Sequence, residues 1–427
     1  MAKDLRSYLR KLYAEAPDQL RRVSREVSHE WEPIAVITKM DREGIYPAVL
    51  FERVKGYEFP LIANILSTRR KFAIAFDTTE EKVAEVIGER EIRQIPPRLV
   101  ATGPVKDVIY TGEEVDLGHL PIVLHHEHND APYITMGVLV CKDPETGMSN
   151  LGIYRHKKSG RNKLGLYYSW GKRLQYIHRK AEMRDQPLDC AIVLGMHPAF
   201  YVASQTQVSR KDGADEYEVA GGLLGEPLEL VKCETVDVEV PARAEIVIEG
   251  RVLPHVRQTE GPFGEYHRYY GQIVDAPEIE VTAITHRKDA IYHDVGQYIE
   301  HITVTIVPNE GHMLRELRKI LPTVKAVHIP LSGTLNHAYI QMEKVNEGDA
   351  KNVLMAALTR TPYLKGAFAF DTDVDIFDES DVLWALSTRV VPDRDIFLVP
   401  GARGNRLDPT TYTLTRLQRD GMVTKIG

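Results

Sequence analysis

The order of apolar and polar residues divides the chain of 427 residues into stretches with different hydrophobic periodicity. In the first hundred residues, helical periodicity alternates with short apolar runs, and the runs 34–37 and 72–76 predict strands in an α/β unit. From about residue 105 to 295 the chain becomes rich in predicted strands. The segments 236–240 and 279–284 alternate polar with apolar residues, so each predicted strand has one buried face. This pattern predicts a β-barrel or a β-sandwich and does not distinguish between them.

Helical and strand patterns alternate again after residue 300, which indicates a second α/β unit. The predicted strands are 301–307, 324–329, 338–342 and 367–370, and the predicted helices are 309–320, with Asn309 as its cap, and 349–359. The charged segment 172–184 predicts a helix within the strand-rich part, and the charged start of the chain, 1–15, is also helix-like. We therefore expect a multidomain α/β protein with domains at 1–105, 106–295 and 296–427.

Composition narrows the class of protein. A formal net charge of -7 with mixed signs argues against a general nucleic-acid binder or a membrane-surface protein. No apolar stretch approaches the roughly 20 residues that a membrane span requires. We therefore expect a cytoplasmic protein whose partners are small molecules. Cys141, Cys190 and Cys233 are far apart and lack zinc-site spacing, so they are interpreted as reduced thiols without chemistry.

The segment Glu260-Gly261-Pro262-Phe263-Gly264-Glu265 places two carboxylates around a turn of Gly and Pro. Glycine permits backbone angles that other side chains forbid, and proline fixes one dihedral, so the turn can hold both acids in one shape. Two carboxylates held close titrate as a coupled pair, which keeps one of them protonated at a higher pH. By itself the motif fits an active-site loop and a solvated surface turn equally well.

A second segment, Ser149-Asn150-Leu151-Gly152-Ile153-Tyr154-Arg155, joins an apolar run to a basic stretch. Arginine suits bidentate binding of a carboxylate or phosphate and stays charged when it is partly buried. Together, Asn150 with Arg155 and Glu260 with Glu265 resemble, in order and spacing, the signature of the UbiD family of reversible decarboxylases, which use prenylated FMN. The segments 194–199, 215–221, 245–250 and 384–389 also resemble that family, and the resemblance covers the chain to about residue 400.

The resemblance implies the architecture and the reaction. It implies a split β-barrel like that of flavin reductases for the central domain, and a C-terminal domain through which relatives form dimers or larger homo-oligomers. The implied activity is reversible non-oxidative decarboxylation of an aromatic, heteroaromatic or α,β-unsaturated carboxylic acid, with CO2 as the other product and a flavin prenyltransferase as the source of the cofactor. Arg155 is implied to hold the substrate carboxylate and pair with Glu260, and Glu265 to transfer the proton.

The resemblance also implies a set of cofactor contacts. In the family a divalent metal, often manganese, held by an Asn, a His and a Glu, bridges to the flavin phosphate, and a monovalent cation such as potassium lies near it. Lys365 resembles a lysine that reaches the phosphate, and its plain alternative is a solvated lysine at a strand end. The implied cofactor-binding residues are Asn150, Ile153, Tyr154, Arg155, Lys172, Arg173, Ser204, Gln205, Glu216 and Lys365.

The metal site departs from the family pattern. Asn150 and Glu216 match two of the three ligands, but near Trp170 the position of the histidine falls on Arg173. A cation there would repel a metal and attract a phosphate. Two alternatives therefore stay open: a metal completed by a ligand from a neighbouring loop, or direct binding of the phosphate by Arg173 or Lys172. The loop 204–214 is longer than usual in the family, which weakens the implied contacts of Ser204 and Gln205 with a monovalent cation.

Other patterns leave alternatives as well. The tract 125–128, His-His-Glu-His, suggests metal ligands, but adjacent residues of an extended segment point to opposite faces, which favours a loop near the pocket or a surface patch. The basic run 155–163 is typical of a solvated hairpin, or it receives a phosphate. The second reading keeps open a phosphorylated aliphatic substrate such as anhydromevalonate phosphate. An FMN-dependent oxidoreductase on the same barrel and a non-enzymatic cofactor carrier are further alternatives.

Overall fold

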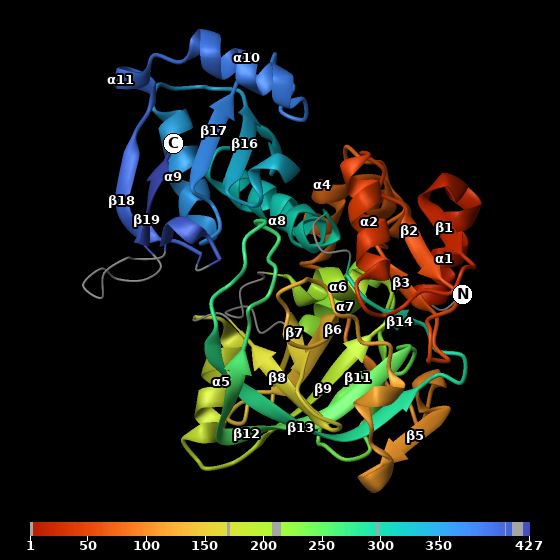
Figure 1. Cartoon of the computed structure of the whole chain (residues 1–427). Coiled ribbons are helices and arrows are strands. Elements are labelled where there is room, and N and C mark those ends of the chain that lie inside the picture. The colour runs from red at the N-terminus through yellow and green to blue at the C-terminus, as the bar shows by residue number, and fades with distance from the viewer. Residues whose placement is uncertain (1–2, 169–170, 207–214, 296–298, 406, 412–421) are drawn as a thin grey trace. The chain divides into compact units, whose positions relative to one another are not determined.

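The computed structural model describes residues 3–168, 171–206, 215–295, 299–405, 407–411 and 422–427 (Figure 1). Its contacts divide the chain into two compact units, one of residues 1–80 and 90–304 and one of residues 81–89 and 305–427. The expected domain bounds at 105 and 295 stay a prediction. No helix within the described ranges is long and apolar enough to cross a membrane.

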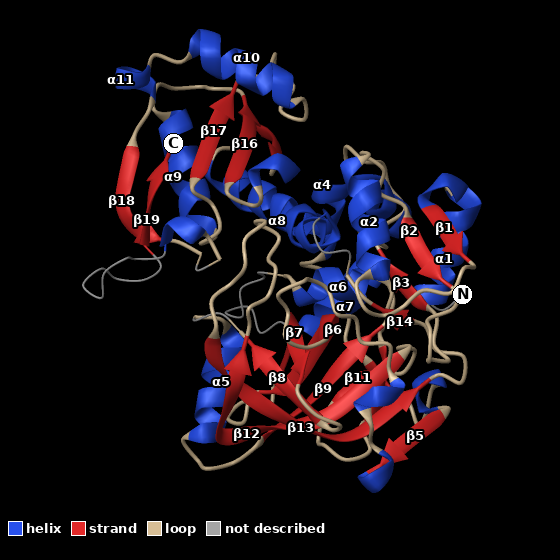
Figure 2. Ribbon diagram, in the orientation of Figure 1, coloured by secondary structure: helices blue, strands red, loops and turns tan. Residues whose placement is uncertain are grey.

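A closed barrel of six antiparallel strands forms the centre of the first unit (Figure 2). Its strands, in order around the barrel, are β12 (Ile246–Glu260), β9 (Leu188–Leu194), β6 (Tyr133–Lys142), β7 (Ser149–Lys158), β8 (Lys163–Tyr167) and β13 (Val274–His286). Pairing of β12 with β13 closes the ring, with Ile248 opposite Ile284, and β5 (Val108–Thr111) extends β13. The pattern at 279–284 is thus confirmed as a strand, and the barrel, not the sandwich, is the fold.

The barrel core consists of branched aliphatic side chains that alternate along the strands. Leu139, Ile192 and Ile248 are buried on neighbouring strands, where β-branched and leucine side chains fill the interior. Helix α5 (Arg173–Glu182) follows β8, and helices α6 (Pro198–Ser204) and α7 (Glu216–Leu224) follow β9. The predicted helix at 172–184 is α5. A small sheet of β4 (Arg98–Leu99), β10 (Glu229–Lys232) and β11 (Glu239–Pro241) lies in the same unit, and the strand predicted at 236–240 begins only at Glu239.

The N-terminal part of the first unit is an α/β layer. Its elements are α1 (Leu5–Glu15), β1 (Leu20–Val23), α2 (Glu32–Arg42), β2 (Ala48–Phe51), β3 (Leu61–Ala63) and α3 (Arg69–Ala75), and β14 (Tyr292–His293) completes the sheet β1-β2-β3-β14. The strands predicted at 34–37 and 72–76 are wrong, since both runs lie in helices, α2 and α3. Ile34 and Ile37 are buried one helical turn apart, and a short apolar run does not separate this spacing from that of a buried strand.

Helix α8 (Ile299–Ile320) carries the boundary between the units. The strand predicted at 301–307 is therefore wrong, and Asn309 lies inside the helix and does not cap it. Ile299, Ile302 and Ile306 are all buried, and their spacing of three and four residues is that of one helix face. Pro308 lies within the helix.

The second unit is built on a five-stranded sheet. Its strand order is β15 (Val324–His328), β16 (His337–Met342), β17 (Gly366–Phe370), β19 (Met422–Ile426) and β18 (Leu398–Arg403), and its helices include α4 (Val83–Arg90), α9 (Asp349–Arg360), α10 (Glu379–Arg389) and α11 (Pro392–Asp395). The strands predicted at 324–329, 338–342 and 367–370 and the helix at 349–359 are confirmed within one or two residues. Short 3-10 turns among the described residues are Pro17–Gln19, Pro104–Lys106, Gly112–Glu114, Leu117–His119, Leu331–Gly333 and Pro409–Thr411.

Candidate active site

Arg155, Glu260 and Glu265 form one buried ion cluster in the first unit. Arg155 lies on β7, Glu260 is the last residue of β12, and Glu265 follows the Gly and Pro turn. The guanidinium donates from Nε to Glu260 Oε1 at 2.8 Å and from Nη2 to Glu260 Oε2 at 2.9 Å, a bidentate pair. Its remaining nitrogen, Nη1, pairs with Glu265 Oε1. Both carboxylates are buried, which rules out the solvated surface turn.

Two aromatic rings fix the plane of the Arg155 guanidinium. Its Cζ atom lies 3.9 Å from the ring centroid of Tyr167 and 4.8 Å from that of Phe263. Arg155 and Tyr167 are direct partners in the pairing of β7 with β8. A cation between ring faces gains electrostatic attraction and loses rotational freedom. The cluster is therefore held in one orientation before any ligand arrives.

The cluster shifts the protonation of its members. Burial raises the pKa of Glu265 above its ordinary value; the Arg155 cation acts in the opposite direction, and the Glu260 carboxylate raises the pKa further. Burial alone would lower the pKa of Arg155, but the two carboxylates outweigh burial and raise it, so the guanidinium stays charged. The site thus combines a permanent cation with one carboxyl group able to carry a proton at a higher pH than usual.

The tract 125–129 holds residues 260–265, which we call the acid loop. Asn129 Nδ2 donates to Pro262 O at 2.8 Å, and the backbone N–H of His126 donates to Asn129 Oδ1 at 2.9 Å. A side chain at Gly264 would overlap the His126 ring, so only glycine permits this approach. The tract therefore fixes the position of the acid loop.

A metal site in this tract is not supported. His125 Nε2 lies 2.9 Å from Asp294 Oδ2, and Thr135 donates to the same carboxylate, so His125 belongs to a buried polar pair. Within the described ranges, no group of three or more His, Cys, Asp and Glu side chains is arranged to hold a metal ion. Of the alternatives that the sequence left open, the structure matches a loop beside the site.

A second polar cluster lies where α5 and α7 begin. Arg173 is the first residue of α5 and Glu216 the first of α7, and Arg173 Nη1 lies 3.5 Å from Glu216 Oε1. Asp215, the N-cap of α7, accepts a hydrogen bond of 3.1 Å from the N–H of Ser149, the residue before Asn150 on β7. Asn150 is 3% exposed, and its Nδ2 has no hydrogen-bond partner among the described residues.

This cluster does not fit the metal set that the resemblance implies. The Arg173 cation pairs with Glu216, which is the one acidic metal ligand that the resemblance implies. A positive charge at this position would repel a divalent ion bound by Glu216. An amide and a carboxylate remain, which are hard oxygen donors but too few for a site with three protein ligands. The donors present, a guanidinium and an amide N–H, suit an anion.

The structure also describes the other residues that the resemblance predicts to bind the cofactor. Ile153 and Tyr154 lie half-buried on β7 beside Arg155, and Lys172 is the N-cap of α5. Ser204 Oγ donates to Tyr201 O at 2.7 Å, and Gln205 is the C-cap of α6. Their cofactor and potassium contacts stay predictions. Trp170 and much of the loop expected to be long, 204–214, lie outside the described residues.

Lys365 lies in the second unit, directly before β17. Its Nζ is 2.9 Å from Asp408 Oδ2 and 2.8 Å from Thr410 Oγ1. The side chain is 28% exposed at the start of the strand, so the plain alternative of a solvated lysine stays open. Contact with a cofactor phosphate stays a prediction.

Sequence reasoning missed the residues that position the cluster. Tyr167, Asn129 and His301 did not stand out, although Tyr167 faces Arg155 directly once the hairpin between β7 and β8 is centred on residue 161. Burial, followed by the charge of Arg155, lowers the pKa of His301 to about 4, so it is neutral at physiological pH. No local pattern marks His301 or Asn129, because their roles depend on contacts across the fold.

Comparison with known proteins shows the family to which this fold and its buried ion cluster belong. Three models of 3-octaprenyl-4-hydroxybenzoate carboxy-lyase match nearly the whole chain: the N-terminal domain over residues 13–91, the Rift-related domain over 98–298 and the C-terminal domain over 303–427. The chain belongs to the UbiD family and is a carboxy-lyase of that family. The resemblance stated from the motifs and the predicted fold class are thereby confirmed.

Individual relatives match along almost their whole length. The chain is 36% identical to the anhydromevalonate phosphate decarboxylase of Methanothermobacter thermautotrophicus over 407 residues, 95% of this chain and 92% of the relative. It is 41% identical to the UbiD-class enzyme HmfF of Pelotomaculum thermopropionicum in complex with FMN, with a TM-score of 0.91 over 99% of this chain and 93% of that one. An evolved dimeric form of HmfF in complex with prenylated FMN is 40% identical, with a TM-score of 0.88 over 93% and 92% of the two chains.

Proposed function

We propose that the protein catalyses reversible, non-oxidative decarboxylation of an aromatic, heteroaromatic or α,β-unsaturated carboxylic acid with prenylated FMN. The observation that carries the proposal is the buried cluster of Arg155 between Glu260 and Glu265. Support for the cofactor comes from HmfF, a relative 41% identical over 99% of this chain that binds FMN, and from its dimeric form with prenylated FMN. When bound, the cofactor supplies a place for the electrons that the departing CO2 leaves behind.

Arg155 orients the substrate carboxylate in this proposal. Two of its nitrogens are held by Glu260, so the nitrogen facing Glu265, Nη1, is the one that can change partner. When Glu265 carries a proton it no longer offers Nη1 a negative charge. Protonation of Glu265 therefore favours binding of a carboxylate at Arg155 and also makes Glu265 an acid, so one event prepares both steps.

Glu265 then moves the proton. After loss of CO2 it donates to the carbon that has lost the carboxyl group, and in the carboxylation direction the resulting carboxylate removes a proton from the same carbon. Burial among Phe263, Tyr133 and the barrel wall keeps water from the acid loop, which maintains the raised pKa of Glu265. Glu260 stays paired with Arg155 and fixes its plane throughout.

Co-expression with a flavin prenyltransferase tests this proposal. The purified protein is denatured, the released cofactor is identified by mass spectrometry, and the intact enzyme is assayed for CO2 release from a panel of unsaturated acids. Prenylated FMN near one equivalent together with CO2 release is expected. Release of ordinary FMN with nicotinamide-dependent redox activity would overturn the proposal in favour of an oxidoreductase.

A phosphorylated aliphatic acid is the second candidate substrate. The observation that favours it is 36% identity to an anhydromevalonate phosphate decarboxylase over 95% of the chain. The same assay distinguishes the candidates when anhydromevalonate phosphate is included beside aromatic and heteroaromatic acids. Turnover of the phosphorylated acid alone would select this candidate.

The remaining features of the proposal concern assembly and setting. We propose a cytoplasmic homodimer or larger homo-oligomer that assembles through the C-terminal domain at 296–427, and a potassium contact near Ser204 and Gln205. Support for the assembly is limited to the dimeric form of HmfF. Sedimentation of the purified protein at micromolar concentration tests it, and a monomer would overturn it.

A further inference from the structure

The start of helix α5 is a place where an anion would be stabilised. The helix runs over ten residues from Arg173, and its N-cap, Lys172, makes no side-chain hydrogen bond to the N–H groups of the first turn. Unpaired N–H groups at a helix start carry a partial positive charge and bind phosphate or carboxylate groups. The Arg173 side chain adds a full charge at the same point.

A second observation points independently to a ligand. Asn150 is 3% exposed, yet its Nδ2 donates to no described residue. A buried donor without an acceptor is destabilising, so native structures rarely keep one that no ligand or water satisfies. Asn150 is on β7, five residues before Arg155, which places the unpaired donor on the strand that carries the ion cluster.

We propose that Asn150 and Arg173 bind the phosphate of the flavin mononucleotide directly, with the guanidinium of Arg173 in place of a divalent metal. The proposal rests on the flavin named in the proposed function. Glu216, 3.5 Å from Arg173 Nη1, is the positioning residue that orients the guanidinium. A guanidinium has five N–H donors, so the edge turned away from Glu216 can contact two phosphate oxygens.

The same geometry argues against a metal. A divalent ion bound by Glu216 would stand close to the Arg173 cation, and the two positive charges would repel each other in this partly buried site. The carboxylate of Glu216 is instead neutralised by the guanidinium. Cofactor binding is therefore expected to be independent of metal.

Titration of the apoprotein with FMN, followed by quenching of flavin fluorescence, tests the proposal. The wild-type Kd is expected to be the same in EDTA and in added MnCl2, and FMN is expected to bind more tightly than riboflavin, which lacks the phosphate. Arg173→Ala is expected to weaken FMN binding about tenfold or more and to remove the preference over riboflavin, because charge-assisted hydrogen bonds to the phosphate are lost. Arg179→Ala, an exposed arginine of the same helix, is the matched control and is expected to bind as the wild type does.

Arg173→His provides a second, opposite test. It creates an Asn, His and Glu set with nitrogen and oxygen donors that suit manganese. FMN binding by Arg173→His is expected to be weak in EDTA and restored by MnCl2, and a thermal melt shows that each variant is folded. Loss of wild-type FMN binding in EDTA with recovery in MnCl2 would overturn the proposal, as would an Arg173→His variant that binds FMN normally in EDTA.

These outcomes are separate from those of the proposed function. A protein that binds FMN without metal but releases no CO2 would contradict the proposed reaction and leave the phosphate site standing. A decarboxylase whose FMN binding requires manganese would contradict the direct phosphate site and leave the proposed reaction supported.

Discussion

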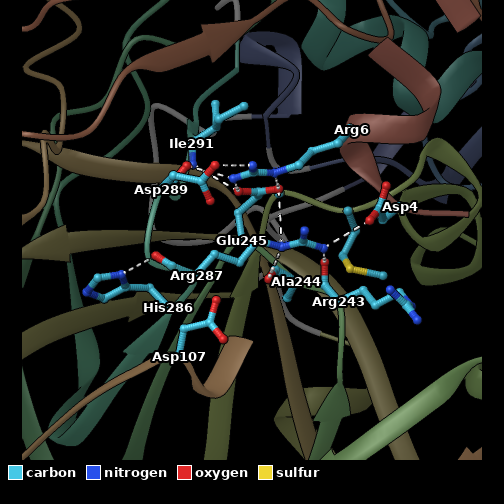
Figure 3. Close-up of polar contacts among 12 residues, drawn as sticks. Asp4, Arg6, Asp107, Arg243, Ala244, Glu245, His286, Arg287, Asp289 and Ile291 are labelled. Carbon is cyan, nitrogen blue, oxygen red and sulfur yellow. Dashed lines mark hydrogen bonds and ion pairs between the residues drawn. The ribbon is translucent and has the colours of Figure 1, made fainter. Parts of the chain in front are cut away.

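Replacing Glu245 with alanine should loosen the attachment of helix α1 to the barrel. Glu245 directly precedes β12 and is fully buried, and its carboxylate accepts from Arg6 Nε and Nη2 at 2.9 Å each and from the N–H of Ile291 at 3.0 Å (Figure 3). Arg287 Nε lies 3.4 Å from the same carboxylate. The substitution would leave two arginines and one N–H without this acceptor.

The expected loss follows from burial and from the partners that remain. Removing one member of a buried ion pair costs about 3–5 kcal/mol. Arg287 keeps hydrogen bonds to Ala244 O at 3.2 Å and to Asp4 Oδ2 at 3.1 Å, so we expect the lower end, about 3 kcal/mol. At about 2 °C per kcal/mol for a unit of this size, the melting temperature should fall by about 6 °C.

Differential scanning fluorimetry measures this loss, and Asp289→Ala is the matched control. Asp289 also pairs with Arg6, but its side chain is 75% exposed, so its removal should cost at most about 1 kcal/mol. Hydrogen exchange over residues 5–15 should speed up in Glu245→Ala and not in the control. Equal melting temperatures for the two variants would refute the argument that burial of the Glu245 carboxylate, and not its charge alone, holds α1.

Three further predictions follow from the site and the buried histidines. Because burial raises the pKa of Glu265, the rate of decarboxylation should be highest while Glu265 is protonated and should fall as pH rises through that raised pKa; a rate that rises there would contradict its role as the acid. Gly264→Ala should push the acid loop away from His126 and lower kcat by tenfold or more at unchanged FMN affinity. Steady-state kinetics and flavin titration measure the two quantities. A wild-type kcat would mean that the loop tolerates a side chain at this position. Burial lowers the pKa of His156 from 6.5 to about 3, so the unfolded chain binds the extra proton and stability is lost as pH falls from about 6.5 to 3. His156→Phe should reduce this slope by about 1.4 kcal/mol per pH unit in urea unfolding, and an unchanged slope would show that His156 does not titrate on unfolding.

In the second unit, β15, β16, β17 and α9 were predicted within one or two residues because their apolar patterns are short and bounded by polar residues, whereas α10, α11, β18 and β19 were not predicted. The run 338–342 is short and followed by a polar loop, and it is strand β16. The strand predictions for the runs 34–37 and 301–307 were wrong because β-branched residues also occur on buried helix faces. Whether such a run forms a strand or a helix depends on what packs against it. Barrel closure depends on the pairing of β12 with β13 across the long connection at 261–273, which alternation alone does not reveal.

The active-site residues were predicted by resemblance, and their arrangement required the fold. The sequence spacing between Arg155 and Glu260 does not show that they form a bidentate pair, nor does it distinguish a buried loop from a solvated turn. The ring contacts of Arg155 come from the neighbouring strand β8, which carries Tyr167, and from Phe263 in the acid loop, which is distant in the sequence. The position of Arg173 could be predicted from spacing, but its pairing with Glu216 could only be seen where α5 and α7 meet.

The most direct test of the account is the rate of CO2 release by Glu265→Gln in the holoenzyme loaded with prenylated FMN. Glutamine keeps the shape of the side chain and can accept a hydrogen bond from Arg155, but it cannot deliver the proton. The account predicts that this variant retains its cofactor and loses turnover by about a hundredfold or more on a substrate that the wild type converts. Full turnover by Glu265→Gln with bound cofactor would contradict the central claim that Glu265 is the acid of the reaction.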